Sequence, residues 1–138
     1  MLYTEAMKLE VGVKALITND KGKYLFVQYS NPLREDEAAR WDIPGGRLKP
    51  DEQLVEALSR ELKAQLKASL LSCAVLSAQD IMLPDVDLHI VRITYQTQIQ
   101  GDLRIGAAQG LYQWATPAEA LKLNVDSYLR HTLEMLAR

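Results

Sequence analysis

The hydrophobic pattern in the first third of the chain alternates between strand-like and turn-like segments. Residues 11–18 (VGVKALIT) are apolar and rich in β-branched side chains, which is typical of a buried strand. Residues 19–22 (NDKG) favour a turn, so we expect residues 23–29 to return as the antiparallel hairpin partner. In residues 41–46 (WDIPGG), the proline keeps the residue before it extended, and the two glycines predict a sharp turn.

A long amphipathic helix is predicted over about residues 52–67. Pro50 and Asp51 are typical of a helix start, with Asp51 as the N-cap that accepts from the amides of the first turn. Leucines recur every fourth residue and form the stripe that should face the core: Leu54, Leu58, Leu62 and Leu66. Positions three and four apart share a helix face, so a second stripe lies beside it: Ala57, Glu61, Ala64, Gln65 and Ala68. Glu61 is the one carboxylate on that second face.

The second half of the chain continues the alternation of strands and helices. It predicts strands at residues 70–77, 89–99 and 111–114, a short helix ending near residue 123, and a closing amphipathic helix over about residues 125–136. Thr116 and Glu119 form a capping box, with Pro117 at the first helical position. Mixed strands with helices on either side predict an α/β fold of the α/β/α sandwich type.

Composition narrows the function classes. The chain has 138 residues, 48% of them hydrophobic, which is enough for one domain with a real core and too short for two ordinary ones, so residues 1–138 are expected to form a single domain. The net charge of -2, with both signs interspersed, argues against a broad surface for nucleic acid polymers. The single Cys73 is most simply a buried thiol and suits a reducing compartment. No membrane-spanning run or signal peptide is evident, so we expect a cytoplasmic protein without a membrane partner.

Five residues in one stretch carry a family resemblance. The sequence WDIPGG at 41–46 and the residues that follow it resemble the Nudix family, whose signature is G-x5-E-x7-R-E-U-x-E-E-x-G-U with U aliphatic. The matching positions are Gly46, Glu52, Arg60, Glu61 and Leu62. Residues 111–123 (LYQWATPAEALKL) are similar to the last strand and following helix of the family. The resemblance covers most of the chain and implies a Nudix-type α/β/α sandwich with a mixed sheet.

The resemblance also implies a chemistry. Nudix hydrolases cleave the pyrophosphate bond of a nucleoside diphosphate linked to another group, with Mg2+ or Mn2+ as cofactor, because a hard cation offsets the phosphate charge. The family's three metal-binding glutamates correspond here to Glu61, Ala64 and Gln65. Glu61 is therefore the expected catalytic group and metal ligand, and Gln65 offers only a neutral carbonyl oxygen. Glu52 and Arg60 are expected to brace the turn and the helix as members of the same catalytic site.

Other positions also depart from the family. The glycine that ends the family's helix is Lys67 here, so a left-handed exit would cost about 1 kcal/mol unless the helix ends differently. Residues 106–110 (GAAQG), where many members carry a further glutamate, hold no carboxylate. Asp85, Asp87 and His89 either compensate with oxygen ligands or a proton acceptor, or are solvated loop residues.

Substrate contacts follow from the resemblance as well. Gly45 and Gly46 are expected to lie against the diphosphate, and Arg40 and Tyr29 to bind the base or a distal group by charge or stacking. Arg34, Trp41 and Tyr112 lie near the same places, although Trp41 and Trp114 are more simply core residues. Nothing in the sequence selects among ADP-ribose, nucleotide sugars, dinucleoside polyphosphates and oxidised nucleoside triphosphates.

Two functions are compatible with this pattern. The first is a divergent Nudix hydrolase, with weak or absent Mg2+-dependent turnover because two glutamates are missing. The alternative is a non-catalytic Nudix-fold module that binds a nucleotide or a protein. The expected partner is a nucleoside diphosphate derivative. A homodimer is a further expectation, since paired domains are common among the family's ADP-ribose enzymes.

Overall fold

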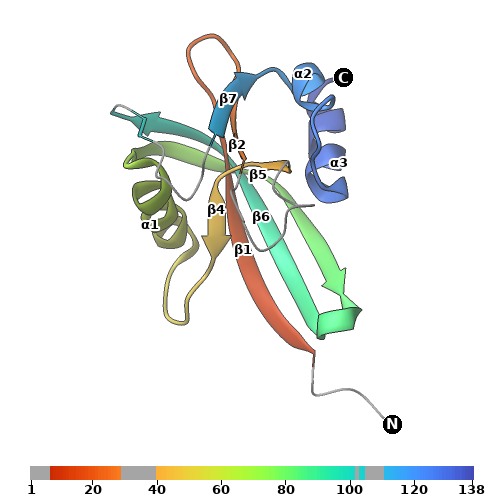
Figure 1. The fold of residues 1–138 in the computed structure, drawn as a ribbon. Coiled ribbons are helices and arrows are strands. Elements are labelled where there is room, and N and C mark those ends of the chain that lie inside the picture. Colours follow the sequence, from red (N-terminus) through yellow and green to blue (C-terminus); the bar gives the residue numbers. More distant parts are fainter. Residues whose placement is uncertain (1–6, 29–39, 102, 105–110) are drawn as a thin grey trace.

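The computed structural model describes residues 7–28, 40–101, 103–104 and 111–138. Two sheets and their helices make up this part of the chain (Figure 1). The elements in order are β1 (Lys8–Ile17), β2 (Tyr24–Gln28), β3 (Trp41–Asp42), β4 (Gly45–Arg47), α1 (Leu54–Leu66), β5 (Ser69–Leu83), the short 3-10 helix η1 (Pro84–Val86), β6 (Leu88–Gln100), β7 (Leu111–Ala115), α2 (Pro117–Ala120) and α3 (Ser127–Leu136).

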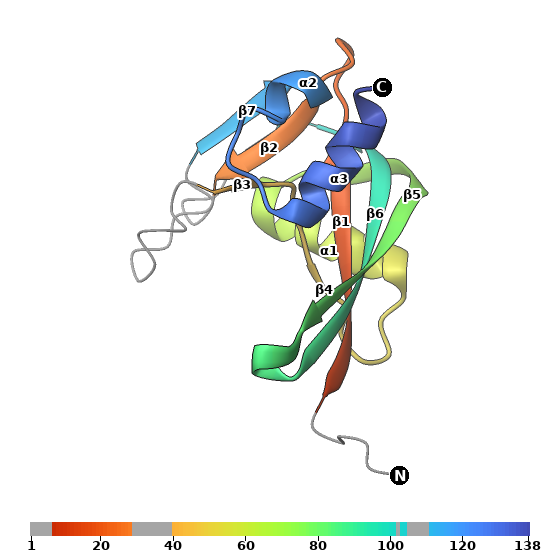
Figure 2. The same ribbon diagram turned by 90° about the vertical axis from the view of Figure 1, so that its right-hand side faces the viewer.

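The larger sheet is mixed and has four strands in the order β4-β1-β6-β5. Strands β1 and β6 run parallel at its centre, while β4 and β5 pair antiparallel with them at the two edges. The smaller sheet is antiparallel, with the order β3-β2-β7. Helix α1 lies on one side of the larger sheet and α3 on the other (Figures 1 and 2). The predicted α/β/α sandwich with a mixed sheet is therefore confirmed.

Two hydrophobic cores lie on the two sides of the sheet. Side chains of β1 point alternately to the two faces of the larger sheet. The core beneath α1 contains Val13, Ala15 and Ile17, and the core beneath α2 and α3 contains Leu16. The predicted leucine stripe of α1 faces the first core, and Leu62 is fully buried. Each fully buried leucine contributes about 1.5–3 kcal/mol relative to an exposed one. Packing therefore fixes the rotation of α1 and with it the direction of its second stripe.

The predicted hairpin between residues 11–18 and 23–29 is wrong. The turn itself forms, since the Asn19 side chain accepts hydrogen bonds from the amides of Lys21 and Lys23 at 3.0 and 2.9 Å. However, both edges of β1 are already paired, with β4 and with β6. Strand β2 therefore belongs to the other sheet, and only the isolated bridge from Thr18 to Tyr24 joins the two segments.

The sharp turn predicted at Gly45 and Gly46 is also wrong, because β4 runs through both residues and pairs with β1. The role of glycine here is close approach: a Cβ on Gly45 would lie 2.1 Å from the backbone oxygen of Val13. The helix start differs as well. Asp51 has a φ of 65° in the preceding turn, and Gln53 is the N-cap, without a side-chain hydrogen bond.

The remaining elements follow the sequence with shifted ends. Strand β5 is longer than the predicted 70–77, and the helix predicted to end near residue 123 stops at Ala120. The capping box of Thr116 and Glu119 is confirmed. Helix α1 leaves through Lys67 in the left-handed conformation, with a φ of 55°. Among the described helices, none has the length and apolar character needed to cross a membrane.

Candidate functional site

The Glu61 carboxylate lies between α1 and β4. Its Oε1 accepts from Arg60 Nη1 at 2.6 Å, and its Oε2 accepts from Gln65 Nε2 at 2.7 Å. The same Gln65 nitrogen donates to the Gly45 carbonyl oxygen at 2.7 Å, which ties the helix to the strand. A Cβ on Gly46 would lie 2.5 Å from Oε1 of Glu61, so the second glycine leaves room for this carboxylate. Helix α1 and strand β4, the glycine strand that contains Gly45 and Gly46, thus form one site.

Arg60 is the bridge between the turn and the helix. Its Nε and Nη2 donate to the two oxygens of Glu52 at 2.7 and 2.9 Å, and Nη2 also donates to the Arg47 carbonyl oxygen at 3.0 Å. The hydrogen bonds from Arg60, followed by the Lys49 amide, lower the pKa of Glu52 to about 2, and the Glu52 hydrogen bond raises the pKa of Arg60 further above its ordinary value. The expected bracing contact between Glu52 and Arg60 is present.

The donor set does not fit the three-carboxylate magnesium site that the resemblance implies. Glu61 is the one carboxylate of its helix face, Ala64 is exposed, and Gln65 directs its amide nitrogen to Glu61. Over the ranges that the structure describes, no group of three or more His, Cys, Asp and Glu side chains could hold a metal ion. Both Glu61 oxygens already accept hydrogen bonds, one of them from a cation. The assignments of Glu61 and Gln65 as metal ligands stay predictions.

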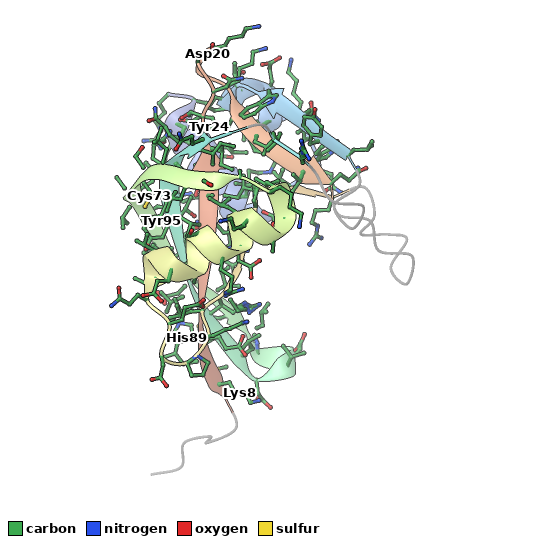
Figure 3. The ribbon with its side chains drawn as sticks, turned by 90° about the vertical axis from the view of Figure 1, so that its left-hand side faces the viewer. Lys8, Asp20, Tyr24, Cys73, His89 and Tyr95 are labelled. Carbon is green, nitrogen blue, oxygen red and sulfur yellow. The ribbon has the colours of Figure 1, made fainter. Side chains whose placement is uncertain are left out.

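The acidic loop and His89 lie at one end of the larger sheet. Asp85 is in η1, Asp87 ends it, and His89 is paired in register with Leu9 of β1. His89 is placed near Lys8 in Figure 3, and its Nε2 lies 2.8 Å from Oδ1 of Asp80. In the described part of the chain, no hydrogen bond or ion pair joins Asp85, Asp87 or His89 to Glu61. The geometry therefore gives no support to the idea that these residues replace the missing glutamates.

The expected substrate contacts are only partly brought together. Gly45 and Gly46 lie beside Glu61 in β4, while Arg40 is exposed just before β3. Tyr29 and Arg34 lie outside the described residues. Trp41 is half-buried against the second core, as its core role predicted. The role of Arg40 and Tyr29 in substrate binding stays a prediction.

Sequence reasoning missed a polar pocket on the other side of Gly46. It has a volume of about 340 Å3 and is lined by Gly12, Lys14, Asp42, Gly46, Arg47, Ile90 and Arg92. Three cations and one carboxylate therefore meet beside the glycine strand. One signal was available in the sequence: Lys14 interrupts the apolar run of residues 11–18, and a charge within a buried strand requires a partner.

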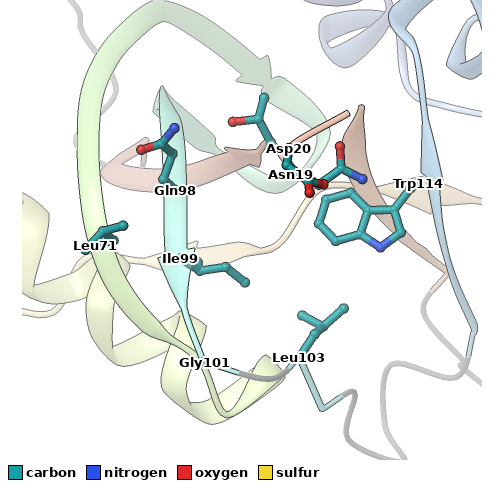
Figure 4. Close-up of a pocket in the computed structure, with 9 residues that line it drawn as sticks. Asn19, Asp20, Leu71, Gln98, Ile99, Gly101, Leu103 and Trp114 are labelled. Atoms are coloured by element: carbon teal, nitrogen blue, oxygen red, sulfur yellow. The ribbon is translucent and has the colours of Figure 1, made fainter. Parts of the chain in front are cut away.

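A second pocket, of about 410 Å3, lies near the turn between β1 and β2 (Figure 4). Trp114 forms one wall and also packs against the first core. The other lining residues are Thr18, Asn19, Asp20, Leu71, Gln98, Ile99, Gly101 and Leu103. Its lining combines apolar and polar side chains, and it shares no residue with the pocket beside Gly46.

The fold and the site define a class: an α/β/α sandwich whose candidate site is built from a glycine-containing strand and an Arg-Glu pair on the adjoining helix. The chain matches the NUDIX domain over residues 8–136. It belongs to the Nudix family, whose members generally use divalent metal ions.

Known relatives agree with this assignment. The chain is 31% identical over 118 residues to a CTP pyrophosphohydrolase of Escherichia coli (strain K12), covering 84% of this chain and 82% of the relative. It is 27% identical over 105 residues to an 8-oxo-dGTP diphosphatase of Proteus vulgaris, covering 72% and 93%.

Solved structures show the same fold. The solution structure of the E. coli ORF135 protein superposes with a TM-score of 0.81 at 26% identity, over 96% of this chain and 91% of that one. The MutT protein from Methanosarcina mazei Go1 gives a TM-score of 0.83 at 23% identity, over 98% and 97%. At that identity the second likeness concerns the fold alone.

Proposed function

We propose that this protein is a divergent Nudix hydrolase that acts on the pyrophosphate bond of a nucleoside diphosphate linked to another group, nucleoside triphosphates included. Its turnover with Mg2+ is weak or absent. Family membership and the activities named for the two relatives, on CTP and 8-oxo-dGTP, support the substrate class. The residues beside Glu61 support the weak turnover, because Ala64 and Gln65 stand at the two positions where the family has its other metal-binding glutamates.

The residues of the candidate site have different roles in this proposal. Glu61 faces the glycine strand and lies closest to the place where a diphosphate would run along Gly45 and Gly46. Arg60 and Glu52 hold the turn and the helix in register through their two-pronged ion pair. Arg40 and Tyr29 bind the base or a distal group. Gln65 supplies a metal ligand only if its amide turns its carbonyl oxygen toward the phosphate.

The alternative is a non-catalytic module that binds a nucleotide. The Gln65 amide nitrogen favours it, because this nitrogen donates to Glu61 where the family's chemistry needs a carboxylate oxygen. A protein with this arrangement would bind its ligand and release it intact. The same fold and the same ligand class apply to both functions, so only turnover separates them.

Turnover assays with a substrate panel test the proposal. CTP, 8-oxo-dGTP, ADP-ribose and a dinucleoside polyphosphate would be incubated with Mg2+ or Mn2+, and phosphate and nucleotide products quantified. We expect slow hydrolysis that Glu61→Gln abolishes, and a gain of about 10-fold or more in the Ala64→Glu/Gln65→Glu variant, since lost metal contacts commonly cost that much. Robust turnover in the unmodified protein contradicts the weak-site proposal. Binding without turnover, even in the double variant, establishes the module instead.

Three further expectations accompany this function. The single Cys73 favours a reducing compartment, and we propose that the protein acts in the cytoplasm. Residues 1–138 are proposed to act as one domain. A homodimer stays a prediction, which sedimentation measurements at several concentrations would test.

A further inference from the structure

We propose that Gln65 is a positioning residue: its side-chain amide holds the Glu61 carboxylate against strand β4, in a place where a glutamate would need a divalent cation to do the same. The junction between α1 and β4 is then closed by hydrogen bonds alone. The inference follows from the misfit between the donor set of this chain and the metal site of the family. It goes beyond the proposed function, because it holds whether or not the protein hydrolyses a substrate.

The Gln65 amide nitrogen bridges the helix and the strand. Its Nε2 lies 2.7 Å from Oε2 of Glu61 and 2.7 Å from the Gly45 carbonyl oxygen. Both neighbours are hydrogen-bond acceptors, so only the NH2 end of the amide can face them, and this end has one N–H group for each of the two oxygens. One side chain therefore serves a carboxylate of α1 and a backbone carbonyl of β4 together.

The Gly45 carbonyl needs a partner from outside the larger sheet. Strand β4 is an outer strand of that sheet and pairs there with β1. The Ala15 amide donates to the Pro44 carbonyl at 2.9 Å, and Gly45 is the next residue, in register with Lys14. Carbonyl groups of successive strand residues point to opposite edges, so the Gly45 carbonyl points away from β1. Gly45 is buried, and leaving its carbonyl without a hydrogen bond would be costly.

The charges around Glu61 also favour an amide at this position. Arg60 donates twice to Glu52 and once to Glu61, so two carboxylates share one guanidinium group and an excess negative charge remains. The Glu52 and Glu61 side chains are only 13% and 17% exposed, which limits their contact with water. Gln65 gives Glu61 a further hydrogen-bond donor and adds no charge.

Helix packing brings the Gln65 amide to this place. Glu61 and Gln65 are four residues apart and therefore share one face of α1. Leu62 and Leu66, which follow them directly, are fully buried in the core beneath α1 and fix the rotation of the helix. Gln65 itself is half-buried. The contact with β4 is therefore set by the packing of the helix.

A glutamate at position 65 would reverse these interactions. It has the same length as glutamine but presents two acceptor oxygens, which would lie against the acceptor oxygens of Glu61 and Gly45. It would also add a negative charge to a site that already has one in excess. A divalent cation holds oxygen ligands of this kind together. The exchange of an acceptor for a donor thus replaces a requirement for a cation with two hydrogen bonds.

Thermal unfolding in EDTA and in millimolar Mg2+ tests the inference. The unmodified protein should have the same Tm in both media. Gln65→Met removes the donor without adding charge and should lower the Tm by about 3 °C or more in both. Gln65→Glu should lower it by about 6 °C or more in EDTA, because it also adds charge, and Mg2+ should restore most of this loss by binding to the folded state. A merely structural hydrogen bond would not produce a difference between the two media.

Gln79→Glu is the matched control. The Gln79 amide also ties a strand to a helix, since its Nε2 donates to the Tyr128 carbonyl oxygen at 2.9 Å. It lies in β5, at the opposite edge of the larger sheet from β4. Any loss of Tm in this variant should be the same in EDTA and in Mg2+. If Gln65→Glu does not fold in EDTA, recovery of its far-UV circular dichroism on addition of Mg2+ gives the same readout.

Three outcomes would overturn the inference. Mg2+ could raise the Tm of the unmodified protein as much as that of Gln65→Glu, Gln65→Met could be as stable as the unmodified protein, or Mg2+ could restore Gln65→Glu no better than Gln79→Glu. The first of these leaves the proposed hydrolase standing. Conversely, binding without turnover in the substrate panel refutes the hydrolase and leaves the role of Gln65 standing, since none of these Tm measurements depends on turnover.

Discussion

Replacing Gly46 or Gly45 by alanine tests how β4 is fitted between β1 and the candidate site. The two glycines are adjacent, yet an added methyl group would meet different neighbours. On Gly46 the new Cβ would lie 2.5 Å from the Cδ and Oε1 of Glu61, which is the far end of a flexible side chain. On Gly45 it would lie 2.1 Å from the backbone oxygen of Val13 and 2.9 Å from the Cα of Lys14.

The magnitudes follow from what has to move. In Gly46→Ala, the Glu61 carboxylate shifts by about 1 Å to reach ordinary contact distance, which disrupts its bonds to Arg60 and Gln65. Arg60 keeps Glu52, so we expect a loss of about 1–2 kcal/mol in the free energy of unfolding. In Gly45→Ala, the clash is with backbone, and β4 must separate from β1. We expect a loss of about 3 kcal/mol or more.

Thermal and urea unfolding of both variants, with pyrophosphohydrolase and binding assays alongside, would measure the difference. For a chain of this size, 1 kcal/mol corresponds to a change of about 3–5 °C in Tm. Gly46→Ala should remain folded while losing whatever activity depends on the position of Glu61. The reasoning is refuted if Gly46→Ala destabilises the protein as much as Gly45→Ala does, or if it retains full Glu61-dependent turnover.

Three further predictions concern stability. The folded-state pKa of Glu52 is lowered to about 2, so its contact with Arg60 stabilises the protein fully above the ordinary pKa of 4.5 and is lost as pH falls toward 2. In urea unfolding, the destabilisation caused by Glu52→Gln should therefore shrink as the pH is lowered from 4.5 to 2. A difference between the two proteins that does not change with pH would contradict this prediction. Leu62→Ala, at a fully buried site, should cost about 2–5 kcal/mol in urea unfolding, and a cost below 1 kcal/mol would mean that α1 is not packed as described. Lys67→Gly should raise stability by about 1 kcal/mol, because Lys67 has a φ of 55°; an unchanged Tm would argue against a left-handed helix exit.

The local features could be predicted because local rules govern them. The leucine spacing of α1 and the capping box of Thr116 and Glu119 depend on residues within one or two turns, and both are confirmed. The Glu52–Arg60 contact was expected from the motif, and its two hydrogen bonds measure 2.7 and 2.9 Å between nitrogen and oxygen. The wrong hairpin and the wrong turn at Gly45 concern strand partners, which a local pattern does not specify.

The sequence by itself determined the family resemblance, the helix that carries Glu61, and the lack of its two usual acidic neighbours at Ala64 and Gln65. Only the tertiary structure decided that Gln65 turns its nitrogen to Glu61 and that Lys14 meets Asp42, 28 positions away, beside the glycine strand. The physical reason is that charges and hydrogen bonds act over a few ångströms in space. Which side chains come that close is settled by strand order and helix packing.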